Sequence, residues 1–248
     1  MRGAATARKK PTAGRRKTEA GALPFRWPRT TIPEVYRRLF AANGKQNWWP
    51  GNSAFEIMVG AVLTQNTAWT NVERAIASLK RNRALSPQAI VKTHPRRLAC
   101  WLKPSGYFNI KAGRLRAMCQ WLIGQGGTRK IAKLPTDELR RRLLAVHGIG
   151  PETADDILLY VFNRPVFVID AYTRRIFARL GLIGGAEDYE TLRHIFENAL
   201  DSNVGLFNEY HALVVVHGKD VCRQRPLCDH CCLAEDCPAS DLSGSQFH

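Results

Sequence analysis

The 248-residue sequence is poor in acidic side chains, with 21 Asp and Glu against 37 Lys and Arg, and its formal net charge is +16. The first 29 residues contain nine of the basic residues and a single Glu, so about half of the excess lies in this short segment. Net charge indicates the kind of partner and not the fold. Surface charge often serves solubility alone, but an excess of this size favours a polyanion such as a nucleic acid.

Long apolar runs are also missing. No segment approaches the length of a membrane-spanning helix, and the N-terminus lacks the apolar core of a secretory signal. We therefore expect a monomeric, cytoplasmic protein, associated with the nucleoid, that does not work at a membrane. Residues 1–29 are expected to form a disordered basic tail, and their scarcity of acids leaves organelle targeting open.

Cysteine is absent from the first 99 residues, and five of the seven cysteines lie in the last 27. Cys100 and Cys119 stand alone in helical patterns and are predicted to pack in the core. Such uneven usage argues against a secreted disulfide framework. It favours a metal site in a reduced compartment.

The candidate ligands follow the spacing Cys222-x5-Cys228-x2-Cys231-x5-Cys237. Zinc sites usually contain two close cysteine pairs separated by a longer arm, whereas only one close pair exists here. A 4Fe–4S cluster, whose corners are spread around a larger body, suits this spacing better, and zinc is the alternative. Cys232 is a spare thiol.

Period-two alternation is not sustained anywhere, and the apolar residues recur at helical spacing, so the sequence predicts an all-α fold. Capping pairs at Thr31 and Glu34 and at Ser53 and Glu56 mark two helix starts. Asn109 is expected to cap a later helix. The expected helices cover residues 32–40, 54–65, 69–79, a short stretch after Ser86-Pro87, 110–122, 139–146, 152–162, 173–180, 189–200 and 208–217. Only Val166–Ile169 resembles a strand, and it is too short to build a sheet.

Two of these helices are joined by the hairpin His147-Gly148-Ile149-Gly150. Glycines allow a close approach of the backbone to a ligand, and Pro151 is suited to open the second helix. Free amides at a helix start bind anions, and on a basic chain the natural anion is a nucleic-acid phosphate. The acid Asp170 follows the second helix. The pattern therefore predicts a DNA-binding hairpin with a catalytic acid beside it.

Six segments in this order resemble the endonuclease III branch of the helix-hairpin-helix (HhH-GPD) DNA glycosylases, and within it the 3-methyladenine glycosylase subgroup. They are GAVLTQNT (60–67), PSGYFNIKA (104–112), HGIGPETA (147–154), VIDAYTRRIF (168–177), HGKDVC (217–222) and the cysteine loop. The resemblance implies two helical lobes with a DNA-binding cleft between them. The expected parts are the tail 1–29, an N-terminal helix 30–50 that packs with the C-terminal lobe, a helical domain 51–165 with the hairpin, and a C-terminal lobe 166–248 whose cysteine loop spans about 217–240.

The resemblance also assigns roles to two acids. Asp170 matches the family's essential carboxylate, which stabilises the positive charge that develops on the sugar and helps a water attack. A plain helix cap is the alternative for this residue. Glu152 occupies the position at which bifunctional members carry a lysine nucleophile, and a glutamate cannot form an imine. Glu152 either takes part in the chemistry or is a favourable acid in a first helical turn.

Further residues are assigned to DNA and to the extruded base. Gln65 is expected to enter the space that the base leaves, or else to bond backbone groups at a helix end. Trp49 and Trp69, and less so Trp48, are candidates for an aromatic base pocket, with ordinary core packing as the alternative. His147, Gly148, Gly150 and Lys111 are predicted DNA contacts. The resemblance further implies a monovalent cation at the hairpin.

The sequence therefore predicts a DNA-repair N-glycosylase that binds double-stranded DNA, flips out an alkylated purine and hydrolyses its bond with Asp170 and water. AP lyase activity is expected to be weak or absent. Two alternatives stay open. One is an oxidised-pyrimidine glycosylase with lyase activity, against which Glu152 argues. The other is a non-catalytic iron–sulfur DNA-binding protein.

Overall fold

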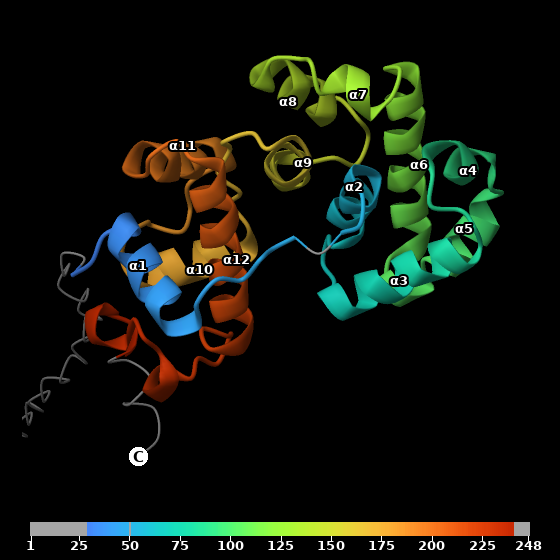
Figure 1. The fold of residues 1–248 in the computed structure, drawn as a ribbon. Helices are drawn as coiled ribbons and strands as arrows, with labels where there is room; N and C mark the ends of the chain where they lie inside the picture. Colours follow the sequence, from blue (N-terminus) through green and yellow to red (C-terminus); the bar gives the residue numbers. More distant parts are fainter. Residues whose placement is uncertain (1–28, 50, 241–248) are drawn as a thin grey trace, which may run out of the picture.

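The computed structural model describes residues 29–49 and 51–240, and all regular elements in these ranges are helical (Figure 1). The all-α prediction is thus confirmed. None of the described helices is long and apolar enough to cross a membrane. The α-helices are α1 (Ile32–Asn43), α2 (Ala54–Leu63), α3 (Trp69–Arg81), α4 (Pro87–Lys92), α5 (Pro95–Trp101), α6 (Phe108–Gly124), α7 (Thr128–Ile131), α8 (Thr136–Leu144), α9 (Pro151–Phe162), α10 (Ala171–Arg179), α11 (Tyr189–Ala199) and α12 (Val204–Asp220). Three short 3-10 helices are η1 (Lys103–Ser105), η2 (Cys228–His230) and η3 (Ala234–Asp236).

Side-chain caps start several helices as predicted. The hydroxyl of Thr31 accepts a hydrogen bond from the backbone N–H of Glu34, and the hydroxyl of Ser53 accepts one from Glu56. The prediction for Asn109 was wrong, because α6 already begins at Phe108 and its cap is Tyr107 in a left-handed conformation. A tight turn through this residue, and not a polar side chain, starts α6.

The extended segment 166–169 joins α9 to α10 and forms no strand. Its side chains are buried, and two of its backbone amides bond to side chains of α11, whereas that of Val166 donates to the carbonyl oxygen of Arg164. The N–H of Phe167 donates to Glu197, and that of Ile169 donates to the hydroxyl of Tyr189. The segment thereby brings Asp170 to the start of α10.

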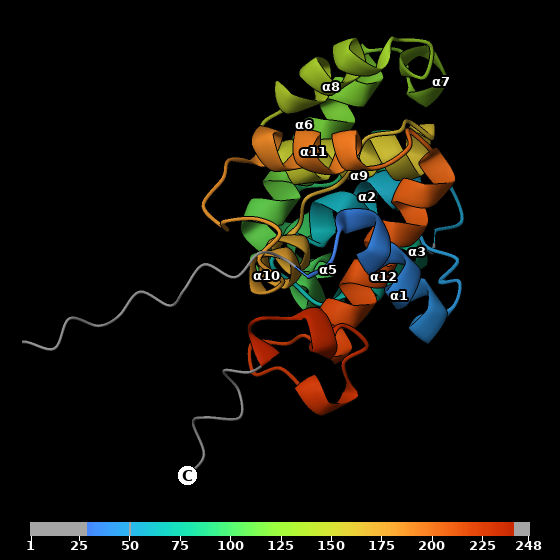
Figure 2. The ribbon, with the colours of Figure 1, turned by 90° about the vertical axis from the view of Figure 1, so that its left-hand side faces the viewer.

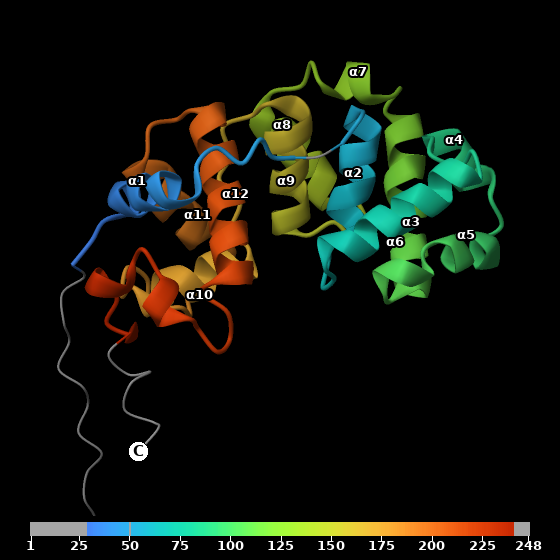
Figure 3. The ribbon, with the colours of Figure 1, turned by 60° about the horizontal axis from the view of Figure 1, so that its bottom comes forward.

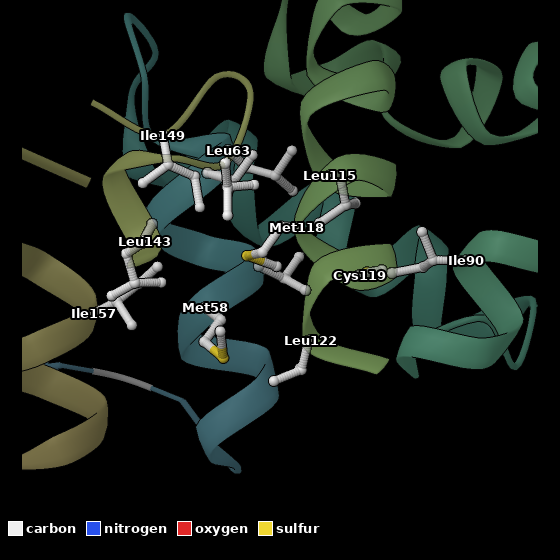
Figure 4. Packing of buried hydrophobic residues seen from close by; sticks show 14 of the residues in the cluster. Met58, Leu63, Ile90, Leu115, Met118, Cys119, Leu122, Leu143, Ile149 and Ile157 are labelled. Carbon is white, nitrogen blue, oxygen red and sulfur yellow. The ribbon is translucent and has the colours of Figure 1, made fainter. Parts of the chain in front are cut away.

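Two hydrophobic cores lie on either side of α9. The first contains apolar side chains of α2 to α8 and of α9, from which Ala154, Ile157 and Leu158 contribute, and Figure 4 shows several of them meeting around α2 and α6. The second contains side chains of α1, of α9, from which Leu159 and Tyr160 contribute, and of α10 to α12. Figures 1 and 3 show α9 between these two groups of helices. A residue near the start of α9 therefore lies where the two groups meet.

The lone cysteines differ from each other. Cys119 is fully buried in the first core, as predicted. Cys100 is exposed, so its predicted core position was wrong. It occupies a solvent-facing position of the short helix α5, in which Leu98 and Ala99 carry the buried face.

An ion-pair network holds the hairpin helices to α11. Arg140 of α8 makes a two-pronged contact with the buried carboxylate of Asp155 on α9, at 2.7 and 3.1 Å. The same guanidinium donates to Glu190 of α11 at 2.7 Å. Planar guanidinium groups suit such paired contacts. Because the three helices belong to different parts of the fold, this network fixes the hairpin relative to α11.

Candidate active site

The hairpin between α8 and α9 requires glycine at its centre. Gly148 has a φ of +85°, and a Cβ there would overlap the aliphatic part of the Arg114 side chain on α6. Gly150 differs, with a φ of −91° and open space at its Cβ position. Pro151 is the first residue of α9, as predicted. The close approach at Gly148 therefore packs the hairpin on α6, while Gly150 leaves the start of α9 open.

A cleft of about 1010 Å³ lies in front of this hairpin. The end of α2, the start of α9 and the start of α10 converge on it. Its lining consists of Thr64, Gln65, Asn66, Thr67, Ala68, Arg114, Gly148, Ile149, Gly150, Pro151, Glu152, Thr153, Asp170, Ala171, Tyr172 and Tyr189. The cleft thus brings together Asp170, Glu152, Gln65 and both hairpin glycines, which sequence analysis had placed at one site.

Gln65 links the end of α2 to the hairpin. Its side-chain amide donates to the carbonyl oxygen of Gly148 at 3.1 Å and to the hydroxyl of Thr153 at 2.9 Å. Its side-chain oxygen accepts a hydrogen bond from Arg114. Gln65 therefore lines the cleft and at the same time hydrogen-bonds a backbone carbonyl group of the hairpin. Arg114 was missed, because one arginine on a helix of a basic chain carries no distinctive signal.

Asp170 is the N-cap of α10 and is largely buried. Its Oδ1 accepts from the backbone N–H of Thr173 at 2.6 Å and from the Thr173 hydroxyl at 2.7 Å. Its Oδ2 lies 3.7 Å from Nε2 of His211 on α12. Burial alone would raise the pKa of this carboxyl, but the contacts with His211 and Thr173 outweigh it and lower the pKa below its ordinary value. Asp170 is thus held as an anion at the cleft.

Glu152 lies on the first turn of α9, in the same cleft. Part of its side chain is exposed to solvent, but the surrounding protein desolvates its carboxyl group. This desolvation, together with the negative charge of Asp170, raises the pKa of Glu152 to about 7. The two carboxyl groups therefore differ in protonation near neutral pH. Unequal carboxyl groups in one site are the usual arrangement for acid–base chemistry.

The prediction that Lys111 contacts DNA was wrong. Its side chain is 2% exposed, and its ammonium group donates to the carbonyl oxygens of Leu63 and Ser105 at 2.9 and 2.6 Å. Burial is the main cause that lowers its pKa to about 8. Lys111 therefore ties the end of α2 to the turn before α6, and it does not present its charge to a ligand. His147, by contrast, is exposed on the hairpin.

The three candidate tryptophans form one cluster. The ring centroids of Trp49 and Trp69 lie 5.2 Å apart, and Trp48 lies within 6.3 Å of both. Trp49 also packs on Tyr160 of α9, at 4.9 Å. None of the three lines the cleft described above. Trp49 lies between Gly60 of α2 and Tyr160 of α9, and a Cβ on Gly60 would meet the rings of Trp49 and Trp69.

The four predicted cysteine ligands line one small, mostly apolar cavity. They belong to the segment that follows α12, drawn in red in Figure 2. Cys232 does not line the cavity. The guanidinium group of Arg179 donates to Sγ of Cys222 at 3.2 Å. Within the described residues, no three His, Cys, Asp or Glu side chains meet closely enough to hold a metal ion.

Comparison with known proteins decides the family. Residues 59–201 match the model of the HhH-GPD superfamily base excision DNA repair proteins. The chain belongs to the HhH-GPD superfamily. The predicted relationship to endonuclease III-type glycosylases is thereby confirmed.

Individual relatives agree with this assignment. The HhH-GPD chain is 43% identical, over 209 residues, to a Methanocaldococcus jannaschii protein whose name describes a DNA repair glycosylase; the match covers 83% of this chain and 95% of the relative. It is 30% identical over 207 residues to endonuclease III of Thermotoga maritima, covering 82% and 89% of the two chains. Among solved structures, the 3-methyladenine DNA glycosylase MagIII of H. pylori bound to 1,N6-ethenoadenine matches with a TM-score of 0.66 at 28% identity, covering 75% of this chain and 96% of that one. An endonuclease III–DNA complex shares the fold, with a TM-score of 0.76 at 18% identity and coverage of 87% and 97%.

Proposed function

We propose that this HhH-GPD protein is a monofunctional DNA glycosylase, which hydrolyses a damaged base from double-stranded DNA without cutting the strand. The observation that carries the proposal is the composition of the cleft. Asp170 and Glu152 both line it, and its described lining contains no lysine. Strand cutting through an imine needs an amine nucleophile, and the cleft supplies carboxyl groups instead.

The two carboxyl groups take different roles in this proposal. As the glycosidic bond breaks, positive charge develops on the sugar, and the anionic Asp170 stabilises it. Glu152, whose pKa is about 7, is partly ionised at neutral pH and can accept a proton from the attacking water. The hydroxide equivalent then bonds to the sugar carbon, and the base leaves with the bonding electron pair.

The hairpin provides the DNA grip. The first amides of α9 lack partners within the helix, and their partial positive charge favours a phosphate. Gly150 leaves that helix start uncovered, since nothing lies within 4 Å of its Cβ position. His147 and Arg114 add side chains on the same side of the fold. A duplex bound here would present its flipped-out nucleotide to the cleft.

An alkylated purine is the substrate class that we propose. Alkylation makes the purine cationic and weakens its bond, so electron-rich rings and a carboxylate suffice as a binding site. The cluster of Trp48, Trp49 and Trp69 would supply such rings next to Tyr160 of α9, outside the described lining of the cleft that holds the two carboxyl groups. The similarity to a 3-methyladenine glycosylase structure supports the same class.

We further propose a 4Fe–4S cluster at the four cysteines. Four thiol side chains line one cavity, and their sequence spacing contains only one close cysteine pair, which fits a cluster better than a single zinc ion. Arg179 places a positive charge against Cys222, which would compensate the negative charge of thiolates. The bound cluster would cross-link the loop after α12 and could exchange electrons. The residues that would hold it are Cys222, Cys228, Cys231 and Cys237.

A panel of duplexes tests the substrate class. Each duplex carries one of 3-methyladenine, 7-methylguanine, uracil, thymine glycol or an A·8-oxoguanine mispair, and each reaction is analysed with and without alkali. The proposal expects release of the methylated purines, with strand cuts only after alkali. Preferred release of thymine glycol, with cuts in the absence of alkali, would support a bifunctional enzyme instead. Binding without release of any base would indicate a non-catalytic protein.

A further inference from the structure

A line of polar side chains runs along α9 behind the cleft. Glu152, Asp156 and Tyr160 recur at intervals of four residues and thus share one face of the helix. Glu152 lies at the cleft, whereas Asp156 and Tyr160 are buried. Oδ1 of Asp156 has no hydrogen-bond partner. Buried carboxyl groups are costly without partners, so this face of α9 needs a compensating group.

That group is His211 of α12, which is 5% exposed. Its Nδ1 lies 2.6 Å from the hydroxyl oxygen of Tyr160, and its Nε2 lies 3.7 Å from Oδ2 of Asp170. The second distance is within the range of an ion pair and slightly too long for a hydrogen bond. His211 therefore bridges the hydroxyl of α9 and the carboxylate at the start of α10.

The proton positions follow from this geometry. A neutral imidazole with its proton on Nδ1 would direct the lone pair of Nε2 at the carboxylate of Asp170, which is repulsive. In the two remaining states, Nε2 carries a proton that faces Asp170. In one of them the hydroxyl of Tyr160 donates to Nδ1, and in the other the doubly protonated imidazole donates to the hydroxyl oxygen.

We propose that His211 is the positioning residue of the active site: clamped at Nδ1 by Tyr160, it holds the Asp170 carboxylate in place as an anion. The inference rests on the proposed role of Asp170. Oδ1 is already fixed twice by Thr173. His211 adds an ion-pair contact at Oδ2, so a partner faces each of the two carboxylate oxygens and opposes rotation of the group.

The charges around the imidazole favour its protonated form. Glu152 and Asp156 face it from α9, and Asp170 faces it from α10. Burial alone would lower the pKa of His211, but these carboxyl groups outweigh it and raise the pKa above its ordinary value. Tyr160 is the remaining titratable neighbour on α9. Arg174 of α10 acts on Glu152, and Glu209 of α12 acts on Tyr160.

A titration by NMR tests the contact without any activity. The histidine side chains are labelled with ¹³C, and the shift of His211 is followed with pH in the wild type and in Asp170→Asn. The Asn side chain still caps α10, so the fold is expected to persist. The pKa of His211 should fall in this variant because its anionic partner is lost. An unchanged His211 titration would overturn the proposal. Glu152→Gln and Asp156→Asn, measured in the same way, separate the influence of those two carboxyl groups.

A pH profile tests the consequence for catalysis. His211→Gln keeps an N–H donor near Asp170 but removes the positive charge. His211 lowers the pKa of both Asp170 and Glu152, so both carboxyl groups should then be harder to ionise. The acidic limb of the single-turnover excision rate, which the proposed base Glu152 sets, should move up by about one pH unit, with the smallest loss at pH 8. A uniform loss at every pH would indicate structural damage only and would overturn the proposal. Tyr160→Phe, which keeps the imidazole but removes its clamp, should shift the limb in the same direction by less.

The proposed function and the proposed role of His211 can be refuted separately. If no lesion is excised by the wild type, the proposed function fails, while the NMR titration still decides whether His211 and Asp170 are coupled. If excision occurs but neither titration nor pH profile changes, the proposed function stands and the role of His211 is refuted.

Discussion

The side-chain amide of Gln65 donates a hydrogen bond to the carbonyl oxygen of Gly148, 3.1 Å away. This contact joins the end of α2 to the hairpin, and Arg114 supports it from α6 by donating to the oxygen of the same amide. The wall of the cleft is therefore built from three segments that are distant in the sequence. Its shape depends on the close packing of the hairpin against Arg114.

The two hairpin glycines should differ when they are replaced by alanine. Gly148→Ala forces an L-residue into a φ of +85° and against Arg114, so we expect a loss of about 1–3 kcal/mol in the free energy of unfolding. Gly150→Ala is the matched control, because its backbone is extended and its Cβ position is open; it should change stability by less than about 0.5 kcal/mol. Urea unfolding measures both. Equal losses would show that the hairpin is not packed as described.

Asp170→Asn should abolish excision while DNA binding is retained. The amide still caps α10, but it carries no negative charge for the sugar, and we expect a rate loss of about 100-fold or more. Asp188→Asn is a closely matched control, because Asp188 caps α11 through the backbone and hydroxyl of Thr191 in the same way. Single-turnover excision and a binding titration are the measurements. A full excision rate in Asp170→Asn would remove Asp170 from the mechanism.

The raised pKa of Glu152 predicts how stability changes with pH. The fold favours the protonated carboxyl, so the wild type should lose stability relative to Glu152→Gln as the pH rises from 4.5, the unfolded value, through about 7. Glu138→Gln is a control of opposite sign, because Arg142 and Arg141 lower the pKa of Glu138. The wild type should be more stable than Glu138→Gln at pH 8, and this difference should fade as the pH falls below 4.5. Thermal unfolding across this range decides; a difference in stability between the wild type and Glu152→Gln that does not change with pH would contradict the desolvated carboxyl.

The cysteine loop should carry iron and acid-labile sulfide after anaerobic purification, in a ratio near one. Ser at any of the four cavity-lining cysteines should lower the iron content, because each is a proposed ligand. Cys232→Ser is the control that should keep it, since Cys232 does not line the cavity. Metal analysis of the variants is the measurement. A colourless protein that contains zinc alone would refute the cluster.

The helices could be predicted from the sequence where nearby residues determine their starts. Thr31 and Ser53 cap their helices by the expected bonds, because a cap needs only its own next turn. The predicted cap at Asn109 was wrong because α6 starts from Tyr107 in a left-handed conformation. A polar residue two positions later does not reveal this backbone conformation. The predicted burial of Cys100 was wrong because α5 has a narrow buried face that does not include this residue.

The site was predicted in part. Asp170, Glu152 and the hairpin were found because they are close in sequence and follow a recognisable pattern. The burial of Lys111 depends on carbonyl groups 48 and 6 residues away, which no local pattern reports. His211 was missed for the same reason, since its partners come from α9 and α10. The spacing of Glu152, Asp156 and Tyr160 along one face of α9 was the available signal for this buried network.

The central claim is that the cleft hydrolyses a glycosidic bond and stops. The most direct measurement follows one duplex, with 7-methylguanine at a defined position, and quantifies released base and cut strand in the same single-turnover reaction, with borohydride present in a parallel sample. The account predicts base release that depends on Asp170, strand cuts only after alkali, and no covalent protein–DNA adduct. Strand cuts without alkali that match base release, with a strong borohydride-trapped adduct, would contradict it.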